Sequence, residues 1–306
     1  MVTNVERREE RARRNARMSR GDRIFGLVNA ALLWIVSIIM LYPLLYVVAC
    51  SFSDPLSVVQ SRITLLPQGA TLAAYERVFR NEMIMSGYKN TLVYTLLGTA
   101  INVVITLMTA YPLSRPDLVG KKAVNSMIAF TMLFSGGMVP TFLVVKDLGL
   151  MDSVWAIVLP GAMSAWNMFI VKNYYMTSIQ RELIEAADVD GASDIRAYLS
   201  IVTPLSAPIV AVMVLYYGVG HWNAYFDALL YLRDKARYPL QLVIRTFFTA
   251  SDYAEQGGGS GDTAMLLINE TMKYALIVIA SAPILCLYPL LQRYFIKGVM
   301  LGAIKG

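Results

Sequence analysis

The sequence predicts an all-α membrane protein that crosses a bilayer about six times. Of its 306 residues, 57% are hydrophobic and only 16% are charged, whereas a soluble domain is about 45–50% apolar and about 25% charged. An apolar excess of this size has to be buried, and a lipid bilayer can bury it. Runs of about 20 apolar residues, the length that a helix needs to cross a hydrocarbon core of about 30 Å, recur along the chain.

Six apolar runs account for this fold class, and each is expected to form one transmembrane helix. The first contains Pro43, which kinks a transmembrane helix without excluding it. Gly136, Gly137 and Pro140 interrupt the third. The runs cover approximately residues 24–51, 91–113, 123–145, 154–175, 208–231 and 272–291.

Basic residues in the short connections predict the orientation. Eight arginines lie within residues 7–23, and lysine and arginine recur at 115–122 and at 293–305. Six spans place all three segments on one side of the membrane, and the positive-inside rule makes that side the cytoplasm. Both termini are then cytoplasmic, and two long segments, 52–90 and 232–271, face outward.

The expected organisation has three parts. Residues 1–23 form a basic cytoplasmic segment, residues 24–292 a transmembrane domain with a cytoplasmic loop at 178–208, and residues 293–306 a cytoplasmic tail. The net charge of +6 is concentrated in the first part, with no basic patch interleaved with aromatic residues elsewhere. This pattern suits the anionic surface of membrane lipid and argues against nucleic acid as a partner.

Other residue patterns exclude several chemistries. Cys50 and Cys286 are expected at opposite ends of the bilayer, as free buried thiols. A single histidine and the lack of a Cys or His cluster offer no metal site. No catalytic constellation is present. No glycine-rich loop ends in Lys-Ser or Lys-Thr, so ATP has no binding motif on this chain.

The polar connection at 178–208 is predicted to form a helix, a turn and a second helix at the inner membrane surface. Thr177 and Gln180 can form a capping box for the first helix. Gly191 permits a backbone turn that a side chain would hinder, and Ser193 can cap the second helix.

Small and acidic residues gather at this turn. The small ones leave room for close packing by another protein, and the ionised carboxylates can pair with a basic residue of that protein. An ordinary amphipathic connection, solvated on one side, fits the same pattern, and spacing does not decide between the two. The residues concerned are Glu185, Ala186, Ala187, Asp190, Gly191 and Ala192.

Glu185-Ala186-Ala187, followed by Asp190-Gly191-Ala192 and later by Pro204-Leu205 and Pro208, resembles the EAA motif of binding-protein-dependent ABC importer permeases. The resemblance extends over nearly the whole chain. It is closest to the carbohydrate-uptake group, the relatives of the smaller maltose permease subunit, and within it to the permeases of lipoprotein-dependent or complex-oligosaccharide importers. Supporting stretches lie at 21–29, 41–55, 110–118, 134–144, 220–234 and 292–306. Gln180 and Thr203 depart from the usual pattern without removing the turn.

The resemblance implies a type I ABC importer permease fold in the bacterial cytoplasmic (inner) membrane. It implies that the motif is a coupling helix that docks on a cytoplasmic ATPase subunit, with Glu185 as its ion-pair partner. ATP and Mg would then be bound by the ATPase, and this chain would bind no cofactor and be no enzyme. The implied partners are a second permease in a heterodimer, two ATPase subunits, an extracytoplasmic solute-binding protein and a carbohydrate substrate.

Further roles follow from the same resemblance. Residues 302–306 could reach between the ATPase subunits, and the outward segments at 53–73 and 232–241 could dock the binding protein. The alternative is a self-contained secondary transporter. Such a carrier would need charges inside the spans or a repeated half, and neither is detected.

The fifth run carries an unusual mixture of aromatic and polar side chains that suits a carbohydrate path. Sugars stack their apolar faces on aromatic rings and form hydrogen bonds through their hydroxyl groups. An equally open interpretation is that these residues pack between helices. They are Tyr216, Tyr217, His221, Trp222, Asn223 and Tyr225, with Asn167 and Asn173 of the fourth run as weaker candidates.

Overall fold

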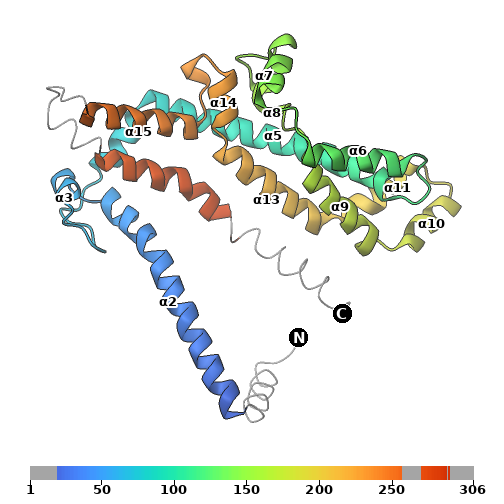
Figure 1. Cartoon of the computed structure of the whole chain (residues 1–306), viewed down its shortest axis with the longest axis horizontal. Coiled ribbons are helices and arrows are strands. Elements are labelled where there is room, and N and C mark those ends of the chain that lie inside the picture. Colours follow the sequence, from blue (N-terminus) through green and yellow to red (C-terminus); the bar gives the residue numbers. More distant parts are fainter. Residues whose placement is uncertain (1–18, 257–269, 288, 290–306) are drawn as a thin grey trace.

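The computed structural model describes residues 19–256, 270–287 and 289, which form helices and connecting loops without a β-strand. An elongated body surrounds α5, which packs against α13, α9 and α15 (Figure 1). The helices in chain order are α2 (Arg20–Ser51), α3 (Pro55–Val59), α4 (Ala73–Arg80), α5 (Glu82–Ser114), α6 (Lys121–Leu133), α7 (Met138–Asp147), α8 (Val154–Val158), α9 (Ala165–Ser178), α10 (Arg181–Val189), α11 (Asp194–Ala197), the π-helical turn η1 (Tyr198–Val202), α12 (Thr203–Leu205), α13 (Ala207–Asn223), α14 (Phe226–Tyr231), the 3₁₀ turn η2 (Lys235–Arg237), α15 (Leu240–Gln256) and a final helix (Glu270–Leu287).

The all-α membrane fold predicted from the sequence is confirmed, but the spans are less regular than six continuous helices. Three described helices, α2, α5 and the final helix, are long and apolar enough to cross a bilayer. The count rises to five if two bent pairs each form one span: α6 with α7, bent by 114°, and the 194–205 segment with α13, bent by 79°. The predicted fourth run at 154–175 is not one helix, because α8 ends at Val158 and α9 begins at Ala165.

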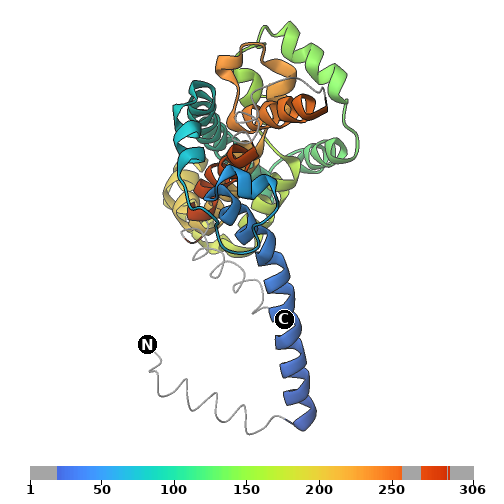
Figure 2. The same ribbon diagram turned by 90° about the vertical axis from the view of Figure 1, so that its left-hand side faces the viewer.

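The first span stands apart from the rest of the chain along most of its length (Figure 2). A capping box between Ser19 and Asp22 begins α2, so the helix starts within the predicted 1–23 segment. Its large apolar side chains remain exposed, and Trp34 is 70% exposed. A helix that is apolar on all sides belongs in lipid or against another apolar helix. Residues 1–18 and the predicted tail at 293–306 lie outside the described residues.

Helix α5 begins nine residues earlier than the predicted second run, which started at Thr91. Asn81 caps it by accepting hydrogen bonds from the backbone N–H groups of Met83 and Ile84. The connection before α15 then folds over this polar first part, because Asn90 donates to the carbonyl oxygen of Ala236 at 2.7 Å. Hydropathy missed this part because its polar side chains bond to protein backbone instead of facing lipid.

Small residues let the helices of the body approach closely, as is usual in membrane bundles. A Cβ added at Gly87 of α5 would lie 3.0 Å from Val243 of α15, and one at Gly98 would lie 2.5 Å from the His221 ring of α13. Apolar packing supports the same contacts. Buried residues such as Leu107, Met168 and Met213 form one core shared by α5, α9 and α13.

The outward segment predicted at 232–271 is largely helical in its described part. It contains η2 and α15, and α15 packs on the amino-terminal half of α5 and on the final helix. The glycine-rich stretch at 257–261 lies outside the described residues. Both cysteines are free, as predicted, but only Cys50 is buried, since Cys286 is exposed on the final helix.

Candidate functional site

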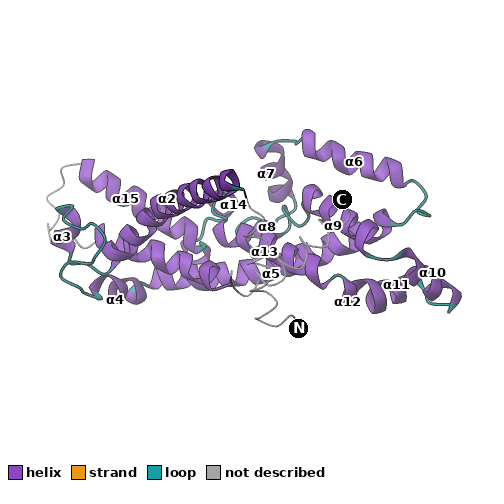
Figure 3. Cartoon of the chain, turned by 90° about the horizontal axis from the view of Figure 1, so that it is seen from below, coloured by secondary structure: helices purple, strands orange, loops and turns teal. Residues whose placement is uncertain are grey.

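The predicted coupling loop lies at one end of the elongated body. Helices α10, α11 and α12 form this end, whereas α3 and α4 lie at the opposite end (Figure 3). The first loop helix starts at Arg181, and Gln180 precedes it without a side-chain cap. The capping box predicted for Thr177 and Gln180 is therefore wrong. The hydroxyl of Thr177 instead donates to the carbonyl oxygen of Asn173 at 2.9 Å, because α9 continues to Ser178.

The turn at Gly191 is a well-defined helix ending. The N–H of Gly191 donates to the carbonyl oxygen of Asp188 at 3.1 Å, and the N–H of Ala192 donates to that of Ala187 at 2.9 Å. This pair of bonds is the Schellman pattern, which favours glycine in the left-handed region. Gly191 has a φ of +74° and open space around it. The glycine is therefore required by its backbone conformation and not by a close neighbour. Ser193 caps α11, as predicted.

The loop presents one face to its own chain and one face outward. Ile184 and Ala187 are buried against the body, whereas Leu183 is 41% exposed. In the sequence, Leu183 and Ala187 are four residues apart, a spacing that predicts one shared helix face. The structure instead pairs Ile184 with Ala187, three residues apart, so Ala187 packs inward and is not a surface contact.

The remaining predicted docking residues lie on the accessible side of the loop. Glu185, Ala186, Asp190 and Gly191 are exposed, and Ala192 is half-buried. Three large apolar side chains flank the turn and stay exposed: Val189, Ile195 and Leu199, at 88%, 72% and 59%. An exposed apolar group rimmed by carboxylates is the kind of surface that marks a protein contact.

Glu185 has a partner within this chain. Its carboxylate lies 2.8 Å from the guanidinium of Arg181, one helical turn earlier, and both side chains are more than half exposed. An exposed pair of this kind contributes about 0–1 kcal/mol, because water screens it. The pair therefore leaves Glu185 free to exchange Arg181 for a cation on another protein.

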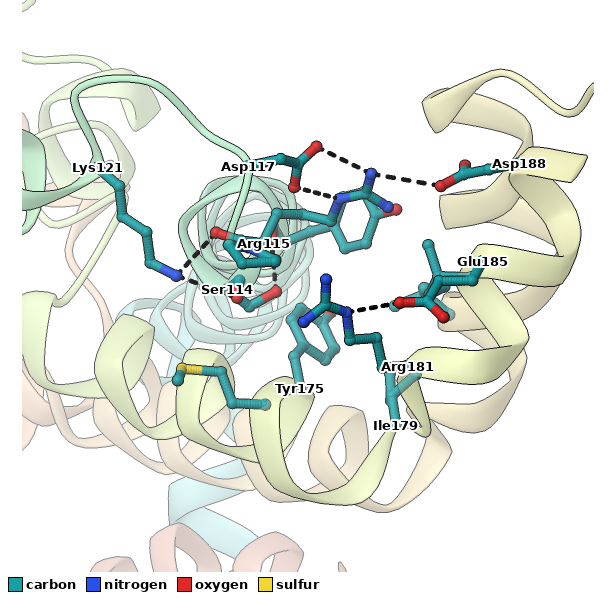
Figure 4. Close-up of a pocket in the computed structure, with 14 residues that line it drawn as sticks. Ser114, Arg115, Asp117, Lys121, Tyr175, Ile179, Arg181, Glu185 and Asp188 are labelled. Atoms are coloured by element: carbon teal, nitrogen blue, oxygen red, sulfur yellow. Dashed lines mark hydrogen bonds and ion pairs between the residues drawn. The ribbon is translucent and has the colours of Figure 1, made fainter.

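Sequence reasoning missed the residue that joins the loop to the bundle. Arg115 follows the carboxyl end of α5, and its side chain is only 18% exposed. The guanidinium lies 3.0 Å from Asp117, 3.7 Å from Asp188 of α10 and 3.6 Å from Asp194 of α11 (Figure 4 shows the first two). The hydrogen bond from Arg115 lowers the pKa of Asp117 below its ordinary value. The sequence showed only the charge of Arg115, because its partners in the loop, Asp188 and Asp194, lie more than 70 residues away.

A cavity of about 430 Å³ separates α10 from the ends of α5 and α9. Arg115, Arg181 and Glu185 contribute to its wall, together with the rings of Tyr111 and Tyr175. Nearby, the ammonium group of Lys121 donates to the carbonyl oxygens of Ser114 and Arg115, which end α5. Ile184 of α10 lines this space and also belongs to the buried core that includes Leu113 of α5 and Tyr175 of α9, so apolar packing and polar contacts together hold the loop to the bundle.

Two of the predicted substrate-path residues are buried within the chain. The Tyr217 hydroxyl lies 2.7 Å from that of Thr106 and accepts a hydrogen bond from the N–H of Ser164, in the break between α8 and α9. The indole N–H of Trp222 donates to the carbonyl oxygen of Ala280 at 2.9 Å. For Tyr217 and Trp222 the structure favours the packing interpretation, because their polar groups are already bonded to neighbouring helices.

His221 is half-buried between α13 and α5, with its Nε2 atom 3.4 Å from the amide oxygen of Asn102. The amide nitrogen of Asn102 donates in turn to the carbonyl oxygen of Gly161 at 2.8 Å. Backbone breaks inside membranes are tolerated where neighbouring side chains satisfy the freed polar groups. Asn102 and Tyr217 do this for the break between α8 and α9.

The other candidates lie nearer the surface. Tyr216 and Asn223 are exposed, and Tyr225 is half-buried with the guanidinium of Arg245 over its ring at 4.7 Å. Asn167 is buried near the start of α9, whereas Asn173 is exposed. Tyr216, His221, Asn223 and Tyr225 remain predictions for the path. Arg245 joins them as a cation that sequence reasoning had not included.

Comparison with known proteins shows close relatives over almost the whole chain. No family model matches it. It is 39% identical over 290 residues to the polygalacturonan/rhamnogalacturonan transport system permease protein YtcP of Bacillus subtilis (strain 168), which covers 93% of this chain and 99% of the relative. It is also 39% identical over 288 residues to Protein LplC of the same strain, over 94% of this chain and 97% of the relative.

A solved structure has the same fold. It is the crystal structure of a bacterial ABC transporter involved in the import of the acidic polysaccharide alginate, and it matches with a TM-score of 0.83 and 35% identity over 91% of this chain and 99% of that chain. The bundled apolar helices define a membrane-spanning protein, and the relatives place it among transporter subunits. The chain belongs to the permease subunits of binding-protein-dependent ABC importers, in their carbohydrate-uptake group. It is accordingly an integral protein of the bacterial inner membrane.

Proposed function

We propose that this permease is driven by a separate ATPase subunit that docks on the loop at 178–208. The observation that carries the proposal is the exposed turn at Gly191, flanked by carboxylates and by the apolar side chains of Val189 and Ile195. A cleft on the ATPase that receives this surface would bury the apolar groups and supply a cation for Glu185. Movement of the ATPase would then displace the loop.

The proposed assembly contains this chain, a second permease with which it forms a heterodimer, two ATPase subunits and an extracytoplasmic binding protein. Two features support a second permease. Helix α2 exposes apolar side chains along most of its length, and the bent α6–α7 pair also exposes large apolar residues such as Phe130 and Leu143. In this arrangement both termini and the loop face the cytoplasm, and ATP and Mg bind to the ATPase.

The test compares two glycine substitutions in the complete transporter, extracted from its native membrane in mild detergent. Gly191 and Gly149 both have a positive φ, +74° and +69°, and neither has an atom within 4 Å of an added Cβ. Alanine at either position therefore costs about 1–2 kcal/mol through backbone strain alone. Only Gly191 lies in the loop. We expect Gly191→Ala to reduce the ATPase recovered with the permease, and Gly149→Ala to leave it unchanged.

Recovery of this chain alone or as a homodimer, with uptake that needs no ATP, would contradict the proposal and favour a self-contained secondary transporter. Equal loss of the ATPase in both variants would mean that general strain, and not the loop, determines recovery.

We also propose that the substrate is an oligosaccharide with acidic groups. One relative is named for polygalacturonan and rhamnogalacturonan, and the matching structure for the acidic polysaccharide alginate. On this chain, the exposed guanidinium of Arg245 lies over the Tyr225 ring, so one side chain offers an aromatic face and the other a charge for a uronate carboxylate. Arg245→Gln should lower uptake of acidic oligosaccharides more than that of neutral ones. Arg77→Gln, on exposed α4, serves as the control. Equal effects on both sugar classes would contradict this role.

A further inference from the structure

Arg115 stands between the two arms of the coupling loop and the central helix of the bundle. Its guanidinium reaches Asp188 in α10, before the Gly191 turn, and Asp194 in α11, after it. Among the residues that the structure describes, no other cation forms ion pairs with both arms. The loop is thus tied on both sides of its turn to one point at the end of α5.

Polar contacts hold Arg115 in position at the carboxyl end of α5. Asp117 holds the guanidinium through two contacts, at 3.0 and 3.1 Å. Lys121 binds the last carbonyl groups of α5 at 3.2 and 2.7 Å, and cations are favoured at a helix carboxyl end. The Arg115 side chain is mostly buried, whereas Asp188 and Asp194 are 46% and 75% exposed. The buried partner therefore belongs to the end of α5, and the more exposed partners belong to the loop.

The space beside Arg115 bears on how displacement of α10 is transmitted to α5. A cavity of about 430 Å³ lies between α10 and the ends of α5 and α9, so packing between these helices is incomplete beside Arg115. Ile184, which lines this cavity, also belongs to the buried core that includes Leu107 and Leu113 of α5. The ion pairs of Arg115 therefore add a polar connection between the loop and α5 to this apolar contact.

We propose that Arg115 is a positioning residue for energy coupling, which transmits displacement of the loop to α5 through Asp188 and Asp194. The inference rests on the proposed function, because it assumes that an ATPase moves the loop. Helix α5 is the element through which such a signal reaches the middle of the bundle. It contacts α9, α13 and α15, and its Asn102 holds both His221 and the break before α9.

The experiment uses the complete transporter in vesicles, with its binding protein and substrate. It measures the substrate molecules transported per ATP hydrolysed, the ATPase recovered with the permease, and the melting temperature. The main variant is Asp188→Asn combined with Asp194→Asn, because both side chains are substantially exposed and amides preserve their size. Arg115→Met and Arg115→Lys are compared with it. Glu76→Gln, which removes the exposed pair with Arg80 on α4, is the matched control.

We expect the double aspartate variant to retain the ATPase and its melting temperature, and to transport at least fivefold fewer molecules per ATP. The ratio of transported molecules to hydrolysed ATP should fall as far in Arg115→Met. Arg115→Lys should retain part of this ratio, because lysine keeps the charge. Glu76→Gln should match the unmodified protein. A merely structural role would change the melting temperature without changing the ratio.

Three results would overturn the inference. One is an unchanged ratio in the double aspartate variant while the ATPase still co-purifies, which would leave the proposed function intact. A second is loss of the ATPase from that variant, because the ion pairs would then shape the docking surface and not transmit motion. The third is failure of the unmodified permease to bind any ATPase, which would overturn the proposed function itself.

Discussion

A methyl group added at Gly98 tests how closely α5 and α13 are packed. Its Cβ would lie 2.5 Å from Nε2 and 2.6 Å from Cε1 of His221, whereas ordinary contact begins at 3.4 Å. The ring must therefore withdraw by about 0.9 Å, the difference between 3.4 and 2.5 Å. Withdrawal is resisted because the adjacent Trp222 is buried and bonded to the final helix. Overpacking of this kind costs about 1–3 kcal/mol.

The assay is the melting temperature of the purified transporter, which changes by about 2–4 °C per kcal/mol in proteins of 150–250 residues. We expect Gly98→Ala to melt several degrees lower than the unmodified protein. Gly220→Ala is the matched control, because Gly220 precedes His221 in α13 but has open space around it. In the background of His221→Ala, the Gly98→Ala change should cost almost nothing, since the clashing ring is gone.

The reasoning would be refuted by a Gly98→Ala protein that melts at the unmodified temperature. It would equally be refuted if the cost persisted in the His221→Ala background, because the strain would then have another source. The same variants bear on the substrate path. If His221 mainly packs against Gly98, its replacement should change stability more than the substrate concentration needed for half-maximal uptake.

Three further outcomes follow from the hydrogen bonds. Tyr217→Phe removes the partner of a buried α5 hydroxyl and of a backbone N–H, so the melting temperature should fall by the equivalent of about 1–3 kcal/mol; a stable variant with lost uptake would instead indicate a sugar contact. Trp222→Phe should cost about 1 kcal/mol by the same measurement, and unchanged stability would contradict its bond to the final helix. Asp152 accepts hydrogen bonds from the N–H groups of Asp234 and Arg233, which lower its pKa. Its contribution is therefore present above its ordinary pKa of about 3.9 and is lost as the pH falls through the lower folded value; an acid limb of the stability profile that is unaltered by Asp152→Asn would contradict this.

Hydropathy located the spans because the length of an apolar run can be read from consecutive residues. It failed where a polar segment is helical and where an apolar segment is interrupted. The first nine residues of α5 are polar enough to look like a loop, yet Ser86 and Asn90 bond to the backbone of the chain near Ala236, 146 residues or more away. The break between 159 and 164 looked apolar enough to continue a span. Asn102 and Tyr217 supply the hydrogen bonds that allow it, and neither is near in sequence.

In the coupling loop, too, features set by adjacent residues could be predicted and features set by distant residues could not. Gly191 and Ser193 could be placed from sequence because turn and cap chemistry depend on adjacent residues. The inward face could not, because Leu183 and Ile184 are equally apolar and either register gives an amphipathic helix. In the sequence, Arg115 served only as a positive charge that predicts the orientation in the membrane. Its role depends on Asp188 and Asp194 folding back onto the end of α5.

Small residues are a second sequence signal, because they mark helix contacts in membranes, where hydropathy does not separate lipid-facing from protein-facing sides. Gly87 and Gly98 of α5 meet that expectation, because an added Cβ at either would press on a neighbouring helix. Gly26 of α2 does not, since no atom of this chain lies within 4 Å of its Cβ position. The same residue type in the same kind of span is therefore a contact in one helix and not in the other. The difference depends on which helices the chain folds together, and for α2 the candidate neighbours are lipid and the proposed second permease.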